Sequence, residues 1–254
     1  MKNCVYMHLA ESTDYCISQF PESNKFITNV KFLPPPVFAN LSILQCNYSV
    51  KHYSNELFSQ LGISCPRPLL NVTPKRKAEF LAGRYLCRLL LLVYGLPPLD
   101  ITIGTNRQPL WPVGWIGSIT HTHNTAISCL ANLSQISLLG IDLEEWIEEN
   151  TANEISKRII DEKELMLLSP LGTHQQKVTL AFSAKESFFK AIYPKVVYYF
   201  DFNVVRLVNV TITNYRFTLQ LKKTLSCSAK EGDLFFGYFN TNEKRVLTFV
   251  MKKC

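Results

Sequence analysis

The chain has 254 residues, of which 47% are hydrophobic, enough apolar side chain for one large or two small folded domains. Its formal net charge of +7 favours an anionic partner: nucleic acid, a phosphorylated small molecule or an acidic protein surface. The eight cysteines include no CxxC pair and no histidines at zinc spacing, so we expect reduced thiols in a cytoplasmic protein rather than a disulfide framework.

Neither an export signal nor a transmembrane segment is expected. The N-terminus has no long apolar stretch, and the most apolar run, Leu89–Tyr94, is far shorter than the roughly 20 residues that span a bilayer. Loose association with a membrane surface stays open.

The first seventy residues predict two strands, around Ile27–Phe32 and Ser42–Val50. Three consecutive prolines at 34–36 separate them and block helix formation there. This part of the chain is the hardest to interpret.

A long helix is expected from about Lys75 to Tyr94. Thr73 is a suitable N-cap, Pro74 fits the first helical position and Gly95 follows the end. The helix carries several basic residues that could bind phosphate or nucleic acid, or form a solvated face: Lys75, Arg76, Lys77, Arg84 and Arg88. Nucleic acid is disfavoured because the chain has no second basic cluster and no aromatic-rich RNA-binding signature. A small phosphorylated ligand fits better.

The middle of the chain predicts a loop, two strands and a helix. The loop spans Gly104 to Gly117, and the strands are Ile127–Leu133 and Ile136–Leu143. A capping box of Thr151 and Glu154 predicts the start of a helix that ends at Ser169-Pro170.

A second capping box, Thr173 with Gln176, predicts another helix that runs to Tyr193. Pro194 is expected to end it. Four polar residues line one face of this helix at helical spacing, where they could serve chemistry: Thr179, Ser183, Glu186 and Lys190.

The last fifty residues predict an antiparallel meander of four strands: Val204–Ile212, Arg216–Leu221, Leu234–Phe239 and Val246–Met251. Each half of the chain thus combines one long helix with several strands. We expect an α+β fold of two similar α/β halves, residues 1–135 and 136–254, related by a pseudo-twofold. Each half would be a small, mainly antiparallel sheet packed with a long helix, with the active site in the cleft between them.

Two carboxylates end the predicted strand 136–143. Asp142 and Glu144 stand two apart, so on a strand both point to one face, where they could hold a hard divalent cation. They could equally be polar residues where a strand meets solvent.

Glu186 and Lys190 stand four apart on the predicted second helix. This is also the spacing of an ordinary helix salt bridge, and Lys185 would then be another surface charge. A metal site beside a cation is what phosphoryl transfer requires, because charge on the moving group must be neutralised.

The segment Gly117–His123 is expected to be a turn before a strand. Its backbone N–H groups and His121 could meet a phosphate, although a histidine in such a turn is more often structural. Zinc binding by His121 and His123 is disfavoured because no third ligand lies nearby.

Four blocks of the sequence together resemble the 4′-phosphopantetheinyl transferase family, in the branch that includes enterobactin synthetase component D. In chain order they are Lys75–Arg84, Arg107–Pro112 continuing into Gly117–His121, Gly140–Glu144 and Phe182–Ala191. The resemblance implies a transferase of the holo-[acyl-carrier-protein] synthase type. It would move the 4′-phosphopantetheine arm of coenzyme A to a serine of an apo acyl, peptidyl or aryl carrier protein or domain. It would use Mg²⁺ and release 3′,5′-ADP, in nonribosomal peptide or polyketide synthesis, an enterobactin-like siderophore pathway being one candidate.

The resemblance also implies the catalytic group. Asp142, Glu144 and Glu186 would ligate Mg²⁺ bound to the pyrophosphate of coenzyme A, and Lys190 would steady the charge that develops there. Glu186 is also the leading candidate for the base that takes the proton of the carrier serine. Whether Glu186 is base, metal ligand or both stays open, since a metal-bound water could relay the proton instead.

In the N-terminal half, the resemblance implies that Thr120 and His121 contact the phosphates of coenzyme A. Arg76, Arg84 and Arg107 would hold its 3′-phosphate and adenine end, a task for which guanidinium groups are suited. The metal ligands and the catalytic helix would lie in the C-terminal half. A noncatalytic carrier-binding scaffold and a metal-dependent phosphohydrolase are the alternative functions.

Overall fold

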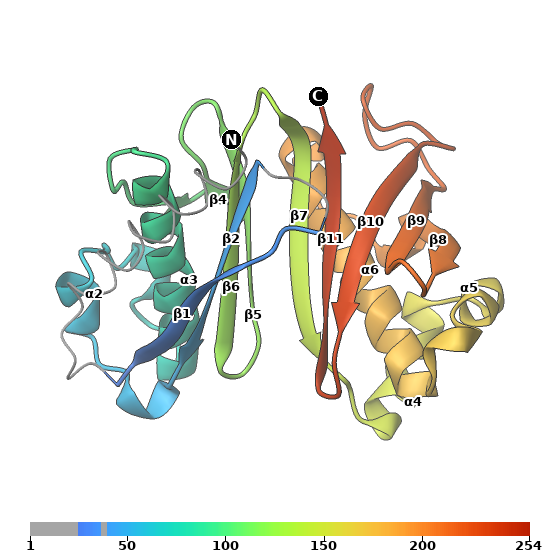
Figure 1. Ribbon diagram of the computed structural model, residues 1–254, viewed down its shortest axis with the longest axis horizontal. Coiled ribbons are helices and arrows are strands. Elements are labelled where there is room, and N and C mark those ends of the chain that lie inside the picture. Colours follow the sequence, from blue (N-terminus) through green and yellow to red (C-terminus); the bar gives the residue numbers. More distant parts are fainter. Residues whose placement is uncertain (1–24, 37–39) are drawn as a thin grey trace. The chain divides into compact units, whose positions relative to one another are not determined.

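The computed structural model describes residues 25–36 and 40–254, and the chain divides into two compact units, Met1–Asn132 and Leu133–Cys254 (Figure 1). The expectation that the N-terminus lacks an export signal falls outside the described residues. Each unit has its own sheet and its own long helix.

The first unit is built on a four-stranded antiparallel sheet of order β1-β2-β6-β5. Its strands are β1 (Ile27–Leu33), β2 (Leu41–Tyr48), β5 (Trp115–His121) and β6 (Thr125–Asn132). A separate small ribbon pairs β3 (Thr102–Ile103) with β4 (Pro109–Leu110), and the helices are α2 (Leu57–Gln60) and α3 (Pro74–Val93). Strands β1 and β2 confirm the pair expected on either side of the three prolines.

The long helix α3 packs on β2 and β6 and begins where the sequence predicts. The Thr73 hydroxyl accepts a hydrogen bond from the Arg76 backbone N–H at 3.3 Å, and Pro74 occupies the first turn. Gly95, just past the end, has φ +69°, a left-handed conformation that suits glycine. Leu81, Leu86 and other apolar residues of α3 are fully buried.

The second unit has a five-stranded antiparallel sheet of order β7-β11-β10-β9-β8. The strands are β7 (Ile136–Glu145), β8 (Val205–Thr211), β9 (Arg216–Leu221), β10 (Leu234–Thr241) and β11 (Arg245–Lys253). The helices are α4 (Glu149–Ile159), α5 (Glu162–Leu167) and α6 (His174–Val196). The predicted meander is confirmed, because β8 to β11 pair in sequence.

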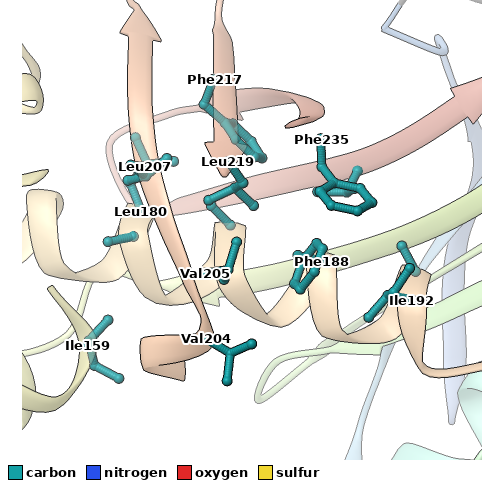
Figure 2. Packing of buried hydrophobic residues seen from close by; sticks show 14 of the residues in the cluster. Ile159, Leu180, Phe188, Ile192, Val204, Val205, Leu207, Phe217, Leu219 and Phe235 are labelled. Carbon is teal, nitrogen blue, oxygen red and sulfur yellow. The ribbon is translucent and has the colours of Figure 1, made fainter. Parts of the chain in front are cut away.

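Helix α6 lies along one face of this sheet and contacts β7 and β11 most extensively (Figure 1). Its apolar side toward β8, β9 and β10 forms the core of the unit, where the rings of Phe188 and Phe235 meet edge to face with centroids 4.8 Å apart (Figure 2). Burying a large apolar side chain such as Phe188 stabilises the fold by about 1.5–3 kcal/mol, so this face holds α6 firmly on the sheet.

The boundaries of the helices after β7 differ from those predicted. The capping box of Thr151 and Glu154 is wrong: α4 begins at Glu149, and its C-cap Ile160 is extended, with φ −141° and ψ 137°. The capping box in this region belongs to Asp161 and Glu164, which start α5. A side chain that caps the backbone competes with helix continuation, so the single expected helix becomes two.

Helix α6 starts at the predicted capping box of Thr173 and Gln176 but continues beyond Pro194 to Val196. Proline removes one backbone donor, yet the last turn closes because the Val197 N–H donates to the Tyr193 carbonyl at 2.8 Å. The expected stop at Tyr193 is therefore wrong by three residues.

The segment Gly117–His121 is strand β5, not the turn expected from its glycine and serine. A Cβ on Gly117 would lie 2.6 Å from the ring of Trp111 and from the Cys129 carbonyl oxygen, so the glycine serves close packing within a strand. His121 ends the strand, and the turn follows at residues 122–124.

The expected α+β class, with a long helix on a mainly antiparallel sheet in each half, is confirmed. The active-site cleft between the halves stays a prediction. No disulfide joins cysteines within the described residues, and burial raises the pKa of the Cys46 thiol to about 12. None of the described helices is both long and apolar enough to cross a membrane.

Candidate active site residues

Strand β7 presents the two predicted carboxylates on the face that α6 covers. Asp142 pairs with Thr248 and Glu144 with Val246 on β11, so both carboxylates share one face with Gly140. A Cβ on Gly140 would overlap the Ser187 carbonyl oxygen and lie 2.6 Å from the Ala191 nitrogen. The glycine thus allows the backbone of α6 to approach β7 closely enough for side chains of the two elements to meet.

Hydroxyl groups on α6 and β11 add polar contacts at this approach. Ser183 donates to the Asp142 carbonyl at 3.3 Å, and its hydroxyl lies 2.9 Å from that of Thr248. Thr179, on the same stripe, accepts from the Ile147 N–H at 3.3 Å. Thr179 and Ser183 are fully buried, so half of the predicted polar stripe fixes the helix to the sheet instead of lining a site.

The structure brings Lys190 of α6 onto Asp142 of β7. The Lys190 ammonium donates to Asp142 Oδ1 at 2.6 Å, while 28% of the lysine side chain and 4% of the aspartate side chain remain exposed. A short, charge-assisted contact of this kind holds both groups in place. The lysine thus has one end at the carboxylates and part of its surface open to solvent.

Asp142, Glu144 and Glu186 influence one another electrically. Burial, followed by the charge of Asp142 and lesser contributions from Glu186 and Glu145, raises the pKa of Glu144 to about 8, although Lys190 opposes the shift. Burial raises the pKa of Glu186 as well; Lys190 lowers it and Asp142 raises it. The group therefore carries more negative charge than Lys190 balances when all three carboxylates are ionised, and it favours binding a proton or a cation.

Within residues 25–36 and 40–254, no three His, Cys, Asp or Glu side chains are arranged so as to hold a metal ion. Oxygen donors from carboxylates are nevertheless the ligands that Mg²⁺ takes, and proteins usually bind Mg²⁺ through one or two carboxylates together with substrate phosphates. The residue types at this face fit such a shared site.

Lys185, beside Glu186, is not the surface charge that helix spacing allowed. Its ammonium is buried and lies 2.8 Å from Glu164 Oε1. Burial lowers the pKa of Lys185, and the charge of Glu164 opposes that shift.

In the first unit, Arg76 and His121 are in contact. Arg76 Nη1 lies 3.0 Å from His121 Nε2 and donates to Glu79 Oε2 at 3.1 Å. Because a guanidinium group only donates, His121 Nε2 accepts in this contact. Glu79 Oε2 also lies 3.8 Å from His121 Nε2.

Glu79 was not among the predicted site residues, although it stands three positions after Arg76 on the same helix, a spacing at which side chains meet. The three side chains form a polar group that joins the start of α3 to the end of β5.

Arg84 lies deeper than a ligand-binding residue on an open surface. It is 9% exposed, its Nε donates to the Ile101 carbonyl at 2.6 Å, and its guanidinium stacks over the Phe80 ring at 4.6 Å from the centroid. Burial lowers the pKa of Arg84, with a smaller contribution in the same direction from the charge of Arg76. This packing gives Arg84 a structural task whether or not it also meets a ligand.

The other two residues of the first unit that the sequence predicts to be ligand contacts, Thr120 and Arg107, lie in different surroundings. Thr120 is buried in β5, opposite Ile127 of β6. Arg107 is exposed in the turn between β3 and β4, where it has φ +67°, and its side chain makes no hydrogen bond or ion pair with another described residue. Its role in ligand binding stays a prediction.

Carboxylates beside a lysine, and an arginine in contact with a histidine, are the side chains with which enzymes neutralise and move phosphoryl groups. The sequence comparisons identify the family of phosphoryl-transfer enzymes to which these side chains point. Residues 66–131 match the model of the 4′-phosphopantetheinyl transferase N-terminal domain, and residues 138–249 match that of the 4′-phosphopantetheinyl transferase superfamily.

Three relatives illustrate the similarity. Enterobactin synthase component D of Salmonella typhimurium is 34% identical over 181 residues, which cover 69% of this chain and 72% of the relative. Enterobactin synthase component D of Escherichia coli K12 is 42% identical over 118 residues, covering 46% and 55%. The 4′-phosphopantetheinyl transferase Svp of Streptomyces mobaraensis is 34% identical over 137 residues, covering 53% and 55%. The chain thus spans just over half the length of the last two.

The chain belongs to the 4′-phosphopantetheinyl transferase superfamily, as the motif resemblance implied. It is accordingly a transferase of phosphopantetheinyl groups, for which coenzyme A is the donor.

Proposed function

We propose that this chain transfers the 4′-phosphopantetheine arm of coenzyme A to a serine of an apo carrier protein or carrier domain and releases 3′,5′-ADP. The observation that carries the proposal is the set of side chains on β7 and α6, with Lys190 2.6 Å from Asp142 and the pKa of Glu144 and Glu186 both raised. The names of the enterobactin synthase relatives support a carrier in nonribosomal peptide or siderophore synthesis, and the holo-[acyl-carrier-protein] synthase type of activity stays a proposal that rests on the motif resemblance.

In this proposal Asp142, Glu144 and Glu186 hold Mg²⁺ together with the pyrophosphate of coenzyme A. The donor set supports this role because its carboxylates repel one another, and a divalent cation relieves that repulsion. When bound, Mg²⁺ would neutralise charge on the phosphoryl group that is transferred. Lys190, which is partly open to solvent, would bind the same phosphate oxygens from the helix side.

Glu186 is the proposed general base. The serine oxygen would form a bond to the β-phosphorus of coenzyme A, the bond from that phosphorus to the oxygen of 3′,5′-ADP would break, and the serine proton would pass to the Glu186 carboxylate. Burial raises the pKa of Glu186, which favours proton uptake by its carboxylate when that carboxylate is not bound to the metal.

The first unit would bind the rest of coenzyme A. Arg76 is half exposed and held by Glu79, so its guanidinium is oriented yet able to meet a 3′-phosphate. His121, which touches Arg76, would contact phosphate oxygens together with Thr120. Arg84 and Arg107 complete the proposed set, so that coenzyme A binding belongs to residues 1–135 and metal binding to residues 136–254. The cytoplasmic location expected from the cysteine pattern of the sequence is part of the proposal.

Incubating the protein with coenzyme A, Mg²⁺ and a panel of apo carrier domains tests the proposal. We expect an increase in carrier mass equal to one phosphopantetheine group, and an accompanying release of 3′,5′-ADP. Release of 3′,5′-ADP at the same rate without any carrier would instead identify a phosphohydrolase. A panel without any mass increase would refute the proposed transfer.

A further inference from the structure

Lys185 of α6 and Glu164 of α5 form a buried polar junction in the second unit. Their side chains are 2% and 3% exposed, and Lys185 Nζ lies 2.8 Å from Glu164 Oε1. The same ammonium donates to the Ile159 carbonyl at 2.6 Å, so it also satisfies the C-terminal end of α4.

Glu164 also binds two backbone N–H groups of the second unit. Its Oε2 accepts from the Asp161 N–H at 3.0 Å, which completes the capping box at the start of α5. Its Oε1 accepts from the Leu207 N–H of β8 at 2.7 Å. One carboxylate therefore ties α5 and β8 to Lys185 of α6.

Lys185 directly precedes Glu186 on α6, and successive residues of a helix point about 100° apart around the axis. A contact that restrains the rotation of α6 at Lys185 thus also restrains the direction of Glu186. Lys190, five positions after Lys185 on the same helix, is held by its own contact with Asp142.

A small rotation of α6 would matter for chemistry. Side-chain ends lie about 5–6 Å from a helix axis, so a rotation of about 10° displaces them by about 1 Å. A displacement of about 1 Å at reacting groups can lower a rate by about 100-fold. The apolar packing of α6 and its close backbone approach to Gly140 also resist such a rotation, and the ion pair adds directional hydrogen bonds to that resistance.

We propose that the Lys185–Glu164 pair is a positioning element for the transfer reaction: it sets the rotation of α6 and thereby holds Glu186 and Lys190 toward the carboxylates of β7. Neither residue of the pair touches the reacting groups in this account. The inference rests on the proposed function, since it concerns the orientation of the residues that would perform the transfer.

The alternative is that the pair serves folding alone. Breaking a buried ion pair by removing one partner destabilises a protein strongly, whereas replacing both charges by neutral groups of similar shape is often tolerated. A double substitution therefore separates the two roles. Glu164→Gln keeps one of the two oxygen acceptors that serve the Asp161 and Leu207 N–H groups, and Lys185→Met keeps most of the lysine volume.

The experiment measures melting temperature, kcat and the KM for coenzyme A of the Glu164→Gln/Lys185→Met double variant in the full chain. Lys195→Met is the control, because Lys195 lies exposed on the same helix. We expect the double variant to melt below the wild type but to stay folded at the assay temperature, with a KM within about threefold of the wild type and a kcat lower by about 10- to 100-fold. The control is expected to match the wild type in all three quantities.

A folded double variant with wild-type kcat would overturn the positioning role. If the double variant does not fold, Lys185→Arg provides the same test, because arginine keeps the charge and the donors but moves them. We expect Lys185→Arg to fold with reduced kcat. A wild-type kcat for this variant would again overturn the proposal. The wild-type protein separates this inference from the proposed function: inactivity of the wild type toward every carrier refutes the proposed function, whereas an active wild type with equally active variants refutes the positioning role only.

Discussion

Substituting Gly140 by alanine tests whether the close approach of α6 to β7 is required for activity. The added Cβ would overlap the Ser187 carbonyl oxygen and lie 2.6 Å from the Ala191 nitrogen. Both contacts are with backbone, which cannot turn aside as a flexible side chain can. Restoring an ordinary contact of 3.4 Å to the Ala191 nitrogen requires α6 to retreat by at least 0.8 Å, and relieving the closer contact with the Ser187 oxygen requires more.

The expected cost follows from this retreat. Inserting an extra methyl group into a packed interior destabilises a protein by about 1–3 kcal/mol. The same retreat separates the carboxylates of β7 from Glu186 and Lys190, so we expect transfer activity to fall by about 10- to 100-fold. Activity should therefore fall by more than the loss of folded protein explains.

Thermal unfolding and the rate of carrier modification measure the two effects on one preparation. Val205→Ala is the matched control, because Val205 is buried in the core of the same unit on β8 and its truncation lowers stability without pressing α6 away from β7. We expect the control to keep its activity at temperatures where it is folded. A Gly140→Ala protein that melts and reacts like the wild type would refute the reasoning.

Three further outcomes are expected. Folding favours the protonated form of Glu144, so the contribution of Glu144 to stability is complete below pH 4.5 and is lost as pH rises to about 8. Glu144→Gln should flatten this decline when the melting temperature is measured against pH without metal. An unchanged pH profile would contradict the raised pKa of Glu144. Arg84→Ala removes the buried donor to the Ile101 carbonyl and should lower the free energy of unfolding by about 1–3 kcal/mol in denaturant titrations, whereas a residue that only binds ligand would leave stability unchanged. Arg76→Ala should raise the KM for coenzyme A with little change in kcat, while Lys75→Ala, which removes an exposed charge next to it, should not; equal effects would indicate only a general loss of positive charge.

Capping residues near the helix ends predicted the starts of the two long helices correctly. Thr73 with Pro74, and Thr173 with Gln176, each begin a helix as predicted, because a cap satisfies backbone groups only three residues away. The Thr151 box failed because α4 already begins at Glu149, before Thr151. The box that forms in this segment is that of Asp161 and Glu164, and Glu164 also gains Lys185 and the Leu207 N–H as partners. Those partners lie 21 and 43 residues away, beyond the range of a local pattern.

The candidate site also combines features set by local sequence patterns with features set by contacts between distant residues. The placement of Asp142 and Glu144 on one face follows from the two-residue period of a strand, and the sequence predicts it. The contact of Lys190 with Asp142 spans 48 residues and depends on the close approach at Gly140, which no periodicity reveals. Lys185 resembled a surface charge because charged residues adjoin it, and only its buried partner Glu164 shows otherwise.

Glu79 could have been predicted from its spacing to Arg76, but the contact of Arg76 with His121 joins residues 45 positions apart. That contact required β5 to begin before the glycine and serine that were interpreted as a turn. Residue chemistry was therefore readable from the sequence in both units, whereas the pairing of residues from different elements came from the fold.

The most direct test of the central claim, that the carboxylates of β7 and α6 perform the transfer, is the rate at which holo carrier and 3′,5′-ADP appear together for wild type, Glu186→Gln and Glu145→Gln. Glu145 is an exposed neighbour of Glu144 and serves as the control for loss of one carboxylate. We predict equal amounts of both products from the wild type and from Glu145→Gln, and neither product from a Glu186→Gln protein that melts like a folded domain. Transfer by folded Glu186→Gln at the wild-type rate would contradict the account.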